Sequence, residues 1–359
     1  MGILSGIRIV EFDALGPVPF LGMVMAGHGA DIVRIVRPGA PVMDKLAGGI
    51  VLHRNRASVE LDLKKPADRD RALRLIATAD ALMEGFRPGV MERLGLGPEP
   101  CLAANPGLVY GRMTGWGQSG PLAHRAGHDI NYLSITGALG AIGPADRPVA
   151  PLNLVADYAG GGMFLGFGLL AALLRARQTG RGSVIDAAMC DAVPVLLSLF
   201  HAFAGLGSWS DNRESNLLDG GAPYYRCYRC SDGQFVAVGA LEPQFYAELM
   251  SGLGLDQALY PQDDRANWMM AQEAIAGIFL TRTRDEWATH FADRDACVTP
   301  VLSLSESFSA PHLLARGVFE RHGTTTMATA AAPRFDNETP SSTAAERYDA
   351  DQAIARWSR

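Results

Sequence analysis

A histidine next to an aspartate, within Gly127-His128-Asp129-Ile130-Asn131-Tyr132, is the first candidate for acid–base chemistry. The segment follows a glycine-rich stretch, and Asp129 is predicted to cap a helix that continues to Ala138. The first N–H groups of such a helix are free to stabilise an oxygen that gains negative charge. Histidine exchanges protons near neutral pH, so His128 is a candidate acid or base. The alternative is that His128 only caps or packs.

Two carboxylates stand at the predicted starts of other helices. Asp157 ends the segment Asn153-Leu154-Val155-Ala156-Asp157 and is soon followed by three glycines, while Glu242 lies between a predicted strand and Pro243. Both are candidates for catalysis. Aspartate is also a favoured helix cap, and a carboxylate in a first helical turn is stabilised by the helix dipole. A purely structural role therefore stays open for both residues.

Arginines in short loops form a third set. Arg37 and Arg87 follow predicted strands, at the edge where α/β proteins hold ligands, and Arg93 comes shortly afterwards. A guanidinium group can bind phosphate oxygens through two hydrogen bonds, so a phosphate-bearing ligand would explain these residues. Solvated surface charge is the alternative.

The first 120 residues alternate strand and helix patterns, which positions these candidates. Short apolar runs predict strands at 7–12, 31–36, 58–63, 81–84 and 108–113, with helices at 20–26 and 67–77. The alternation predicts an α/β fold with a Rossmann-like parallel sheet. The turn after the first strand, Ala14 to Pro19, lacks the three glycines of a dinucleotide-binding fingerprint, so that site is not expected.

Helices and a second, smaller α+β domain are expected in the rest of the chain. One helix is expected over 157–177 and another over 189–204. The glycines at 160, 161 and 162 make sense if another backbone or a ligand packs closely against the first of these helices. Strands on either side of Ser231-Asp232-Gly233 predict a hairpin, and 324–342 reads as an extended strap. The expected bounds are a large domain at 1–200 with 320–359, linkers at 201–221 and 313–323, and a small domain at 222–312.

Composition excludes several classes of function. Hydrophobic residues make up 48% of the 359 residues and the formal charge is −6, so a packed core is expected and a nucleic-acid partner is not. The start of the chain lacks a signal-peptide pattern, and the apolar run Met163–Leu174 suits a buried core helix better than a membrane span. We therefore expect a cytoplasmic protein. Cys227 and Cys230 lack further zinc ligands at a suitable spacing, so no metal site is expected.

Several long strings together resemble the α-methylacyl-CoA racemases, within the family III CoA-transferase superfamily. The resemblance covers essentially the whole chain. The strings lie at 29–34, 84–90, 113–118, 127–132, 219–225 and 239–246, and they include Glu-Gly-Phe-Arg-Pro-Gly-Val, Gly-His-Asp-Ile-Asn-Tyr and Gly-Ala-Leu-Glu-Pro-Gln-Phe-Tyr. Such racemases are interlocked homodimers, whose active site lies between the large domain of one chain and the small domain of the other.

The resemblance implies roles for individual residues. His128 and Asp157 match the two catalytic bases, and Glu242 matches the glutamate that supports the histidine. No separate cofactor is implied, because coenzyme A is part of the substrate. The implied substrate- and CoA-binding residues are Arg37, Leu61, Asp62, Leu63, Lys64, Gly85, Phe86, Arg87, Arg93, Gly127, Asp129, Ile130, Asn131 and Tyr132.

The implied reaction interconverts the (2R) and (2S) forms of a 2-methylacyl-CoA through an enolate. Inversion removes the α-proton on one face and returns a proton on the other, which needs two acid/base groups around one carbon. Met113, Met163 and Met189 would suit a sliding acyl tail, although ordinary core methionines are the alternative. The main competing function is CoA transfer with Asp157 as covalent acyl carrier. The transferases lack the histidine of Gly-His-Asp and carry a glycine-rich loop in the small domain, which we do not find at 222–312.

Overall fold

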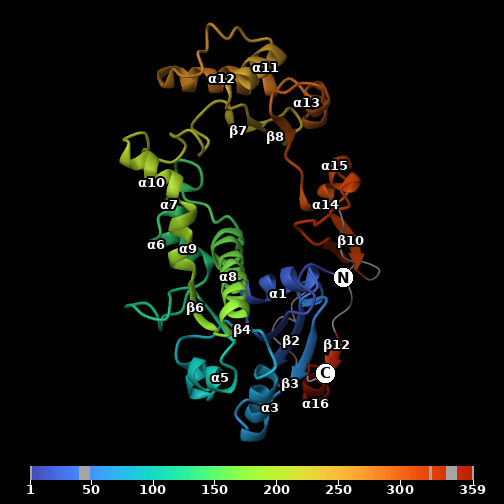
Figure 1. The fold of residues 1–359 in the computed structure, drawn as a ribbon. Coiled ribbons are helices and arrows are strands. Elements are labelled where there is room, and N and C mark those ends of the chain that lie inside the picture. The colour runs from blue at the N-terminus through green and yellow to red at the C-terminus, as the bar shows by residue number, and fades with distance from the viewer. Residues whose placement is uncertain (1, 40–48, 323–325, 337–345, 358–359) are drawn as a thin grey trace. The chain divides into compact units, whose positions relative to one another are not determined.

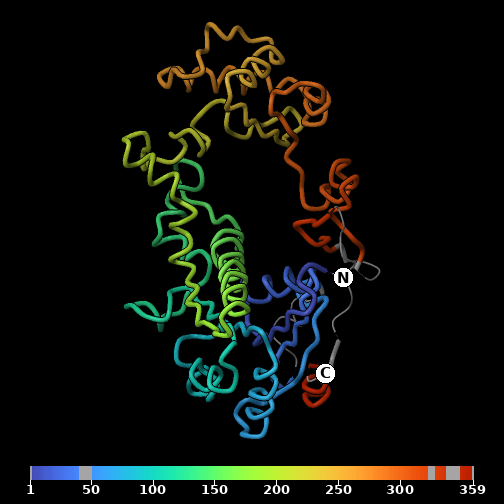
Figure 2. Tube along the Cα trace, viewed as in Figure 1, coloured from blue at the N-terminus to red at the C-terminus, as the bar shows by residue number. Residues whose placement is uncertain are grey.

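The chain divides into two compact units. The computed structural model describes residues 2–39, 49–322, 326–336 and 346–357. The larger unit comprises Met1–Thr136, Pro151–Leu197 and His312–Arg359, and the smaller comprises Gly137–Ala150 and Ser198–Pro311. The chain thus leaves the larger unit twice, briefly over Gly137–Ala150 and then over Ser198–Pro311, as the colours along the trace in Figure 2 allow the reader to follow. The bounds expected from sequence differ, because 137–150 groups with the smaller unit and part of the expected linker 201–221 is helical.

The larger unit is built on a parallel sheet of seven strands (Figure 1). Their order is β12-β3-β2-β1-β4-β5-β6, and each neighbouring pair is parallel. The strands are β1 Arg8–Phe12, β2 Asp31–Val36, β3 Ala57–Glu60, β4 Ala81–Glu84, β5 Val109–Thr114, β6 Ser183–Ala188 and β12 Glu346–Tyr348. The predicted α/β fold is therefore confirmed. The central strands β1, β2, β4 and β5 are buried along nearly their whole length because helices cover both of their faces.

Helices bury the two faces of this sheet. On one face, α3 (Pro66–Ile76), α5 (Pro98–Ala104) and α16 (Ala350–Trp357) share a core with the inward side chains of β1, β2, β4 and β5. The other face is covered by α1 (Pro17–Gly27) and α8 (Phe164–Thr179). Leu165 and Leu169 of α8 lie against Gly111 of β5, whereas the neighbouring Tyr110 points into the first core. The short helices α2 (Gly49–Leu52), α4 (Val90–Arg93) and α15 (Pro311–Ala315) lie in connections.

The helix expected over 157–177 has two parts. A π-helical segment, Leu154–Met163, precedes α8 and contains the three glycines. A Cβ at Gly161 would lie 3.0 Å from Cβ of Pro17, one at Gly162 would lie 3.1 Å from the Pro17 carbonyl oxygen, and one at Gly160 would lie 3.2 Å from Val193. The glycines therefore allow α1 and α9 (Met189–Leu196) to pack closely against this segment, as the sequence suggested.

Helix α8 is buried on one side only. The segment Leu154–Thr179 is long and apolar enough, by length and composition, to cross a membrane. In the fold its Leu165 and Leu169 pack on β5, while Phe167 and Leu174 are 75% and 65% exposed. The sequence suggested a buried core helix. The structure instead leaves an exposed apolar face on α8.

The smaller unit has an antiparallel sheet covered by helices. Strands β7 (Tyr225–Arg229) and β8 (Phe235–Gly239) form the expected hairpin, and β9 (Val298–Pro300) joins β8. Tyr228 and Val236 of the sheet share a core with α11, α12 and α13. The helices of this unit are α7 (Ala138–Ala141), α10 (Ser198–Gly205), α11 (Pro243–Leu253), α12 (Trp268–Phe279), α13 (Arg284–His290) and α14 (Leu304–Ser307), with a 3₁₀ turn at Arg265–Asn267.

The segment expected to form a strap is partly a hairpin of the larger unit. Strand β11 (Thr326–Thr329) pairs with β10 (Phe319–His322) in an antiparallel ladder. Residues 337–342 of the expected strap lie outside the described residues, as do 324 and 325.

Candidate active site

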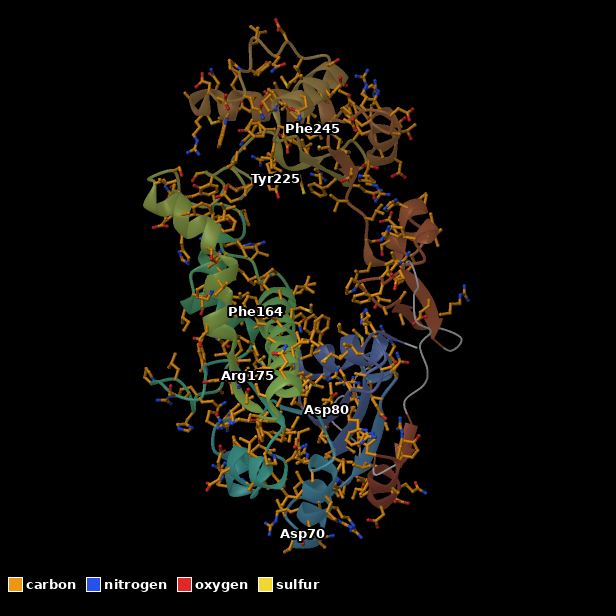
Figure 3. The ribbon with its side chains drawn as sticks, in the orientation of Figure 1. Asp70, Asp80, Phe164, Arg175, Tyr225 and Phe245 are labelled. Carbon is orange, nitrogen blue, oxygen red and sulfur yellow. The ribbon has the colours of Figure 1, made fainter. Side chains whose placement is uncertain are left out.

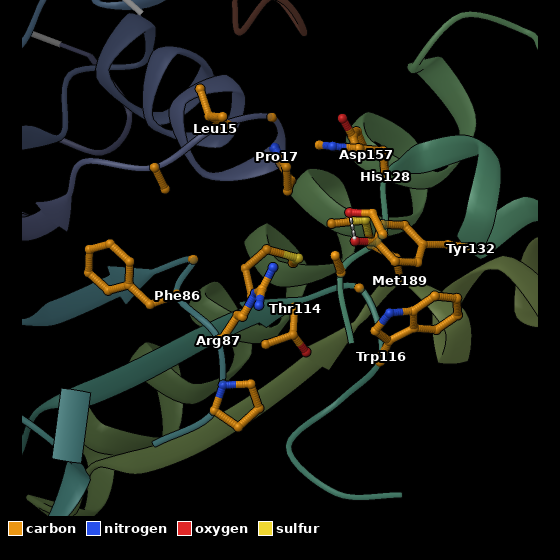
Figure 4. A pocket seen from close by; sticks show the side chains of 18 of the residues that line it. Leu15, Pro17, Phe86, Arg87, Thr114, Trp116, His128, Tyr132, Asp157 and Met189 are labelled. Carbon is orange, nitrogen blue, oxygen red and sulfur yellow. Dashed lines mark hydrogen bonds between the residues drawn. The ribbon is translucent and has the colours of Figure 1, made fainter. Parts of the chain in front are cut away.

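A pocket of about 530 Å³ opens at the carboxyl edge of the parallel sheet (Figure 4). Loops after β1, β2 and β4 contribute Asp13 to Pro17, Arg37 and Gly85 to Pro88, and the ends of β5 and β6 contribute Met113 to Trp116 and Met189. Ligands of open parallel sheets bind at this edge. All the lining residues belong to the larger unit, so the pocket is a property of that unit.

The two predicted bases line this pocket together. His128 is the N-cap of α6 (Asp129–Ile135), with an extended backbone, and Asp157 lies in the π-helical segment. The two side chains lie close enough for His128 to oppose the rise in the pKa of Asp157. Figure 4 shows both at one wall of the pocket. Residues 29 positions apart in sequence therefore meet in one cavity.

Burial is the main cause of a raised pKa at Asp157. The negative charge of Asp129 adds to the rise, while a hydrogen bond from Nδ2 of Asn153 to Oδ2 of Asp157, 3.2 Å long, opposes it. A carboxyl group with a raised pKa is a better match for proton transfer at neutral pH than an ordinary aspartate. Asn153, four residues before Asp157, thus donates a hydrogen bond that orients the Asp157 carboxylate.

Asp129 has a different role from the one expected. The N-cap of α6 is His128, whose backbone N–H donates to Oδ1 of Asn131 over 3.1 Å. The Asp129 carboxylate turns inward and accepts hydrogen bonds from the backbone N–H groups of Ala156 and Asp157, both 2.8 Å long. Its side chain does not line the pocket, and neither do Ile130 and Asn131.

Tyr132 and Trp116 fix the turn that precedes His128. Tyr132 packs against Gly115 and Gly127, where a Cβ would lie within 3 Å of the ring, and its hydroxyl donates to the Gly127 carbonyl oxygen. The Trp116 ring meets that of Tyr132 edge-on at 4.7 Å. A tyrosine hydroxyl is a donor at neutral pH, and burial raises the pKa of Tyr132 further, to about 12. Trp116 was not singled out from the sequence.

The structure brings together only some of the expected CoA-binding residues. The pocket is lined by six of them: Arg37, Gly85, Phe86, Arg87, Gly127 and Tyr132. Arg125, three residues before His128, also lines it and was not predicted from the sequence. Of the rest, Leu61 is buried in the sheet core, Asp62, Leu63 and Lys64 follow it in the turn after β3, and Arg93 is exposed on α4.

The methionines divide in the same way. Met113 and Met189 line the pocket, whereas Met163 is half exposed at the end of the π-helical segment and does not. Two flexible apolar side chains therefore stand near the bases.

Glycine at position 16 is required for the approach of the loop after β1 to Asp157. Gly16 has φ +72°, and a Cβ there would lie 2.9 Å from Oδ2 of Asp157. We expect Gly16→Ala to lower kcat by at least tenfold because the new methyl group displaces the carboxylate. Gly6→Ala is the matched control, since Gly6 has φ +84° and open space around its Cβ position. Equal kcat losses in the two variants would contradict a specific contact with Asp157.

A buried glutamate holds the loop after β4. Oε2 of Glu84 accepts a hydrogen bond from the Phe86 N–H, 2.7 Å long, and Oε1 accepts one from Nε of Arg112, 3.2 Å long. Arg112 also forms an ion pair with Glu92 at 2.8 Å. Glu84 therefore positions the backbone that carries Phe86 and Arg87 into the pocket. Its burial raises its pKa to about 7, against the opposing effects of the Phe86 N–H and Arg112.

This pKa predicts a pH-dependent stability. The carboxyl group of an unfolded glutamate titrates near pH 4.3, so between about pH 4.3 and 7 the folded state holds a proton that the unfolded state has lost. The free energy of unfolding should fall with rising pH in this window, by up to about 1.4 kcal/mol per pH unit from this group. Denaturant unfolding at pH 5 and 8 should show a larger decrease for wild type than for Glu84→Gln. Replacement of the exposed Glu99 should leave the pH dependence unchanged, and an identical dependence in wild type and Glu84→Gln would contradict this assignment.

Glu242 belongs to the smaller unit. It is the N-cap of α11, directly before Pro243. Partial burial raises the pKa of the Cys297 thiol, and the charge of Glu242 adds to that rise. The pocket with His128 and Asp157 lies in the larger unit, so Glu242 and the two bases belong to different units of the chain.

Comparison with known proteins identifies the family of the chain. Residues 4–348 match CoA-transferase family III. The chain is 43% identical over 347 residues to mouse alpha-methylacyl-CoA racemase, covering 96% of this chain and 89% of the mouse protein. It is 45% identical over 318 residues to the human protein of that name, covering 88% and 82%. The crystal structure of a CAIB/BAIF family protein from Brucella suis shares the fold, with a TM-score of 0.84 at 21% identity over 99% of both chains.

These matches confirm the resemblance to the α-methylacyl-CoA racemases, which the sequence strings had suggested. They extend over nearly the whole chain and include the segments that carry His128, Asp157 and Glu242. The chain is therefore an enzyme that belongs to CoA-transferase family III.

Proposed function

We propose that this enzyme interconverts (2R)- and (2S)-2-methylacyl-CoA thioesters by a 1,1-proton transfer between two bases. The observation that carries the proposal is that His128 and Asp157 line the same pocket. Inversion at the α-carbon requires an acid/base group on each face, because one group cannot reach both faces of a bound substrate. An imidazole and a carboxyl group with a raised pKa meet that requirement.

In the proposed reaction, one base removes the α-proton from C2. The electron pair of the C–H bond forms the C1–C2 double bond, and the thioester oxygen becomes an enolate oxygen. The other base then donates its proton to the opposite face of C2, which restores the thioester as the other epimer. Backbone N–H groups at the start of α6 are the proposed donors to the enolate oxygen, since they lie next to His128. No step requires a separate cofactor.

The arginines of the pocket support a CoA thioester as the substrate. Arg37 and Arg87 are exposed in loops at the pocket and are suited to phosphate oxygens of the CoA moiety. We propose that residues 61–64 and Arg93 contact parts of CoA that extend beyond the pocket. Met113 and Met189 would face the acyl tail, whose position must change between the two epimers.

We further propose an interlocked homodimer in the cytoplasm. In it, Glu242 of one chain would stand beside His128 of the other and favour the charged imidazole. Two features support the proposal: Glu242 and the pocket belong to different units, and α8 carries the exposed apolar residues Phe167 and Leu174. An exposed apolar face of this kind is typical of a surface that another chain covers.

A CoA transferase is the alternative, because the family also contains transferases. A racemase needs no second substrate, whereas a transferase needs an acceptor acid and would carry the acyl group on Asp157. The test is incubation of one epimer of a 2-methylacyl-CoA with the enzyme alone, followed by chiral separation. The proposal expects both epimers in nearly equal amounts. Retention of the starting epimer, with CoA transfer once an acid is added, would favour the transferase.

A further inference from the structure

We infer that Asp129 is a positioning residue that fixes the spacing between the two bases. The inference rests on the proposed function, since it assigns a role within two-base proton transfer. Its starting point is that one residue is joined to both bases: Asp129 is covalently bonded to His128, and its carboxylate binds the backbone of Asp157.

The contacts of Asp129 form a clamp between α6 and the π-helical segment. Its Oδ2 accepts the N–H groups of Ala156 and Asp157, each at 2.8 Å, and the carboxylate is almost fully buried. These N–H groups lie in the first turn of the segment, where they have no carbonyl partner within the helix. Hydrogen bonds from backbone N–H groups to a buried carboxylate are short and strong, so the clamp resists sliding of one element along the other.

The Asp129 charge also acts on Asp157 directly. It is one of the causes of the raised pKa at Asp157, and its Oδ1 is buried with no hydrogen-bond partner among the described residues. The titratable groups whose charges act on Asp157, or on which its charge acts, are His128 at the N-cap of α6 and Asp129 and Tyr132 within that helix. Helix α1 contains no titratable side chain, and α9 carries Cys190 and Asp191. Cys190, and Arg87 from the loop after β4, act on Tyr132.

Loss of the clamp should separate two measurable processes. Exchange of the α-proton with solvent requires only one well-placed base, because that base can release the proton to water and return another. Inversion requires both bases to stand at one carbon at the same time. A shift of about 1 Å between catalytic groups is enough to cost roughly 100-fold in rate. A loosened clamp should therefore reduce inversion more than exchange.

The experiment follows both processes in deuterated water with one epimer as substrate. For Asp129→Ala we expect inversion to fall roughly 10- to 100-fold, KM to change less than about threefold, and the ratio of inversion to exchange in recovered substrate to fall. Asp80→Ala is the matched control, because the Asp80 carboxylate also accepts a backbone N–H, that of Arg8 at 2.8 Å, at the opposite edge of the sheet (Figure 3). It should leave the ratio at the wild-type value.

Asp129→Asn separates the clamp from the charge. The asparagine oxygen can still accept both N–H groups, so inversion should recover substantially relative to Asp129→Ala. Removal of the negative charge should move the acidic limb of the pH–rate profile to lower pH, because that charge raises the pKa of Asp157. A role confined to folding would not move this limb.

Two results would overturn the inference. One is an unchanged ratio of inversion to exchange in folded Asp129→Ala, and the other, decisive if that variant does not fold, is a ratio in Asp129→Asn far below that of wild type, because the asparagine oxygen keeps both hydrogen bonds of the clamp. Either can occur in an enzyme whose wild type racemises, so the proposed function would survive. If the wild type itself does not invert the substrate, the proposed function fails and the inference falls with it.

Discussion

Asp157→Asn is expected to lower the rate of racemisation by roughly 10²- to 10⁴-fold while the protein remains folded. The factor is that of a lost general acid–base group. Asparagine has nearly the same shape as aspartate but cannot take or give the proton. Residual exchange by His128 should persist for one epimer of the substrate, since His128 still faces one side of the α-carbon.

The stability of this variant provides an internal control. Burial disfavours the ionised Asp157 side chain, so its replacement by a neutral amide should leave the free energy of unfolding unchanged or increased. Loss of activity together with undiminished stability would identify a side chain retained for chemistry. Asp186→Asn is a suitable matched variant, because Asp186 accepts the Gln118 N–H at 3.1 Å, does not line the pocket and should keep wild-type activity. Turnover by Asp157→Asn within tenfold of wild type would exclude Asp157 as a base.

His128→Ala should have the second large effect, again a roughly 10²- to 10⁴-fold loss of inversion. The side chain of His128 is exposed at the pocket, so thermal stability should change little. The informative measurement is exchange of the α-proton from each epimer separately. His128→Ala should retain exchange from the epimer whose proton faces Asp157, and Asp157→Asn should retain it from the other.

This opposite pattern distinguishes two bases from one. If a single residue served both faces, one variant would lose exchange from both epimers and the other would lose it from neither. Chemical rescue of His128→Ala by added imidazole, with no rescue of Asp157→Asn, would further assign the lost group. Equal loss of exchange from both epimers in both variants would contradict the proposed roles.

The sequence alone predicted the sheet and its edge well, because these depend on local patterns. The runs at Arg8–Phe12, Asp31–Val36 and Ala81–Glu84 are short, mostly apolar and alternate with helices along the chain, which is typical of buried parallel strands. Residues placed just after such strands, such as Arg37 and Arg87, necessarily gather at one edge. The pairing of His128 with Asp157 in one pocket was expected only through the family resemblance.

Other features were not predictable because they depend on contacts across the fold. Asp129 was predicted to be an ordinary N-cap, yet its carboxylate accepts hydrogen bonds from the N–H groups of residues 27 and 28 positions later. The segment Leu154–Met163 was expected to be ordinary helix, yet it is π-helical and lies close to α1 and α9 at its glycines. Glu84 looked like part of a family string, and only its burial beside Arg112 shows that it positions the Phe86 backbone.

The most direct test of two-base racemisation is α-proton exchange in deuterated water. Each epimer of a 2-methylacyl-CoA is incubated separately with the wild-type enzyme, and the deuterium content of both epimers is measured as inversion proceeds. The two-base account predicts that product formed at early times carries one deuterium at C2, because the donating base has exchanged its proton with solvent, while the unreacted substrate gains deuterium more slowly. Intact CoA binding with neither inversion nor deuterium at C2 would contradict the account.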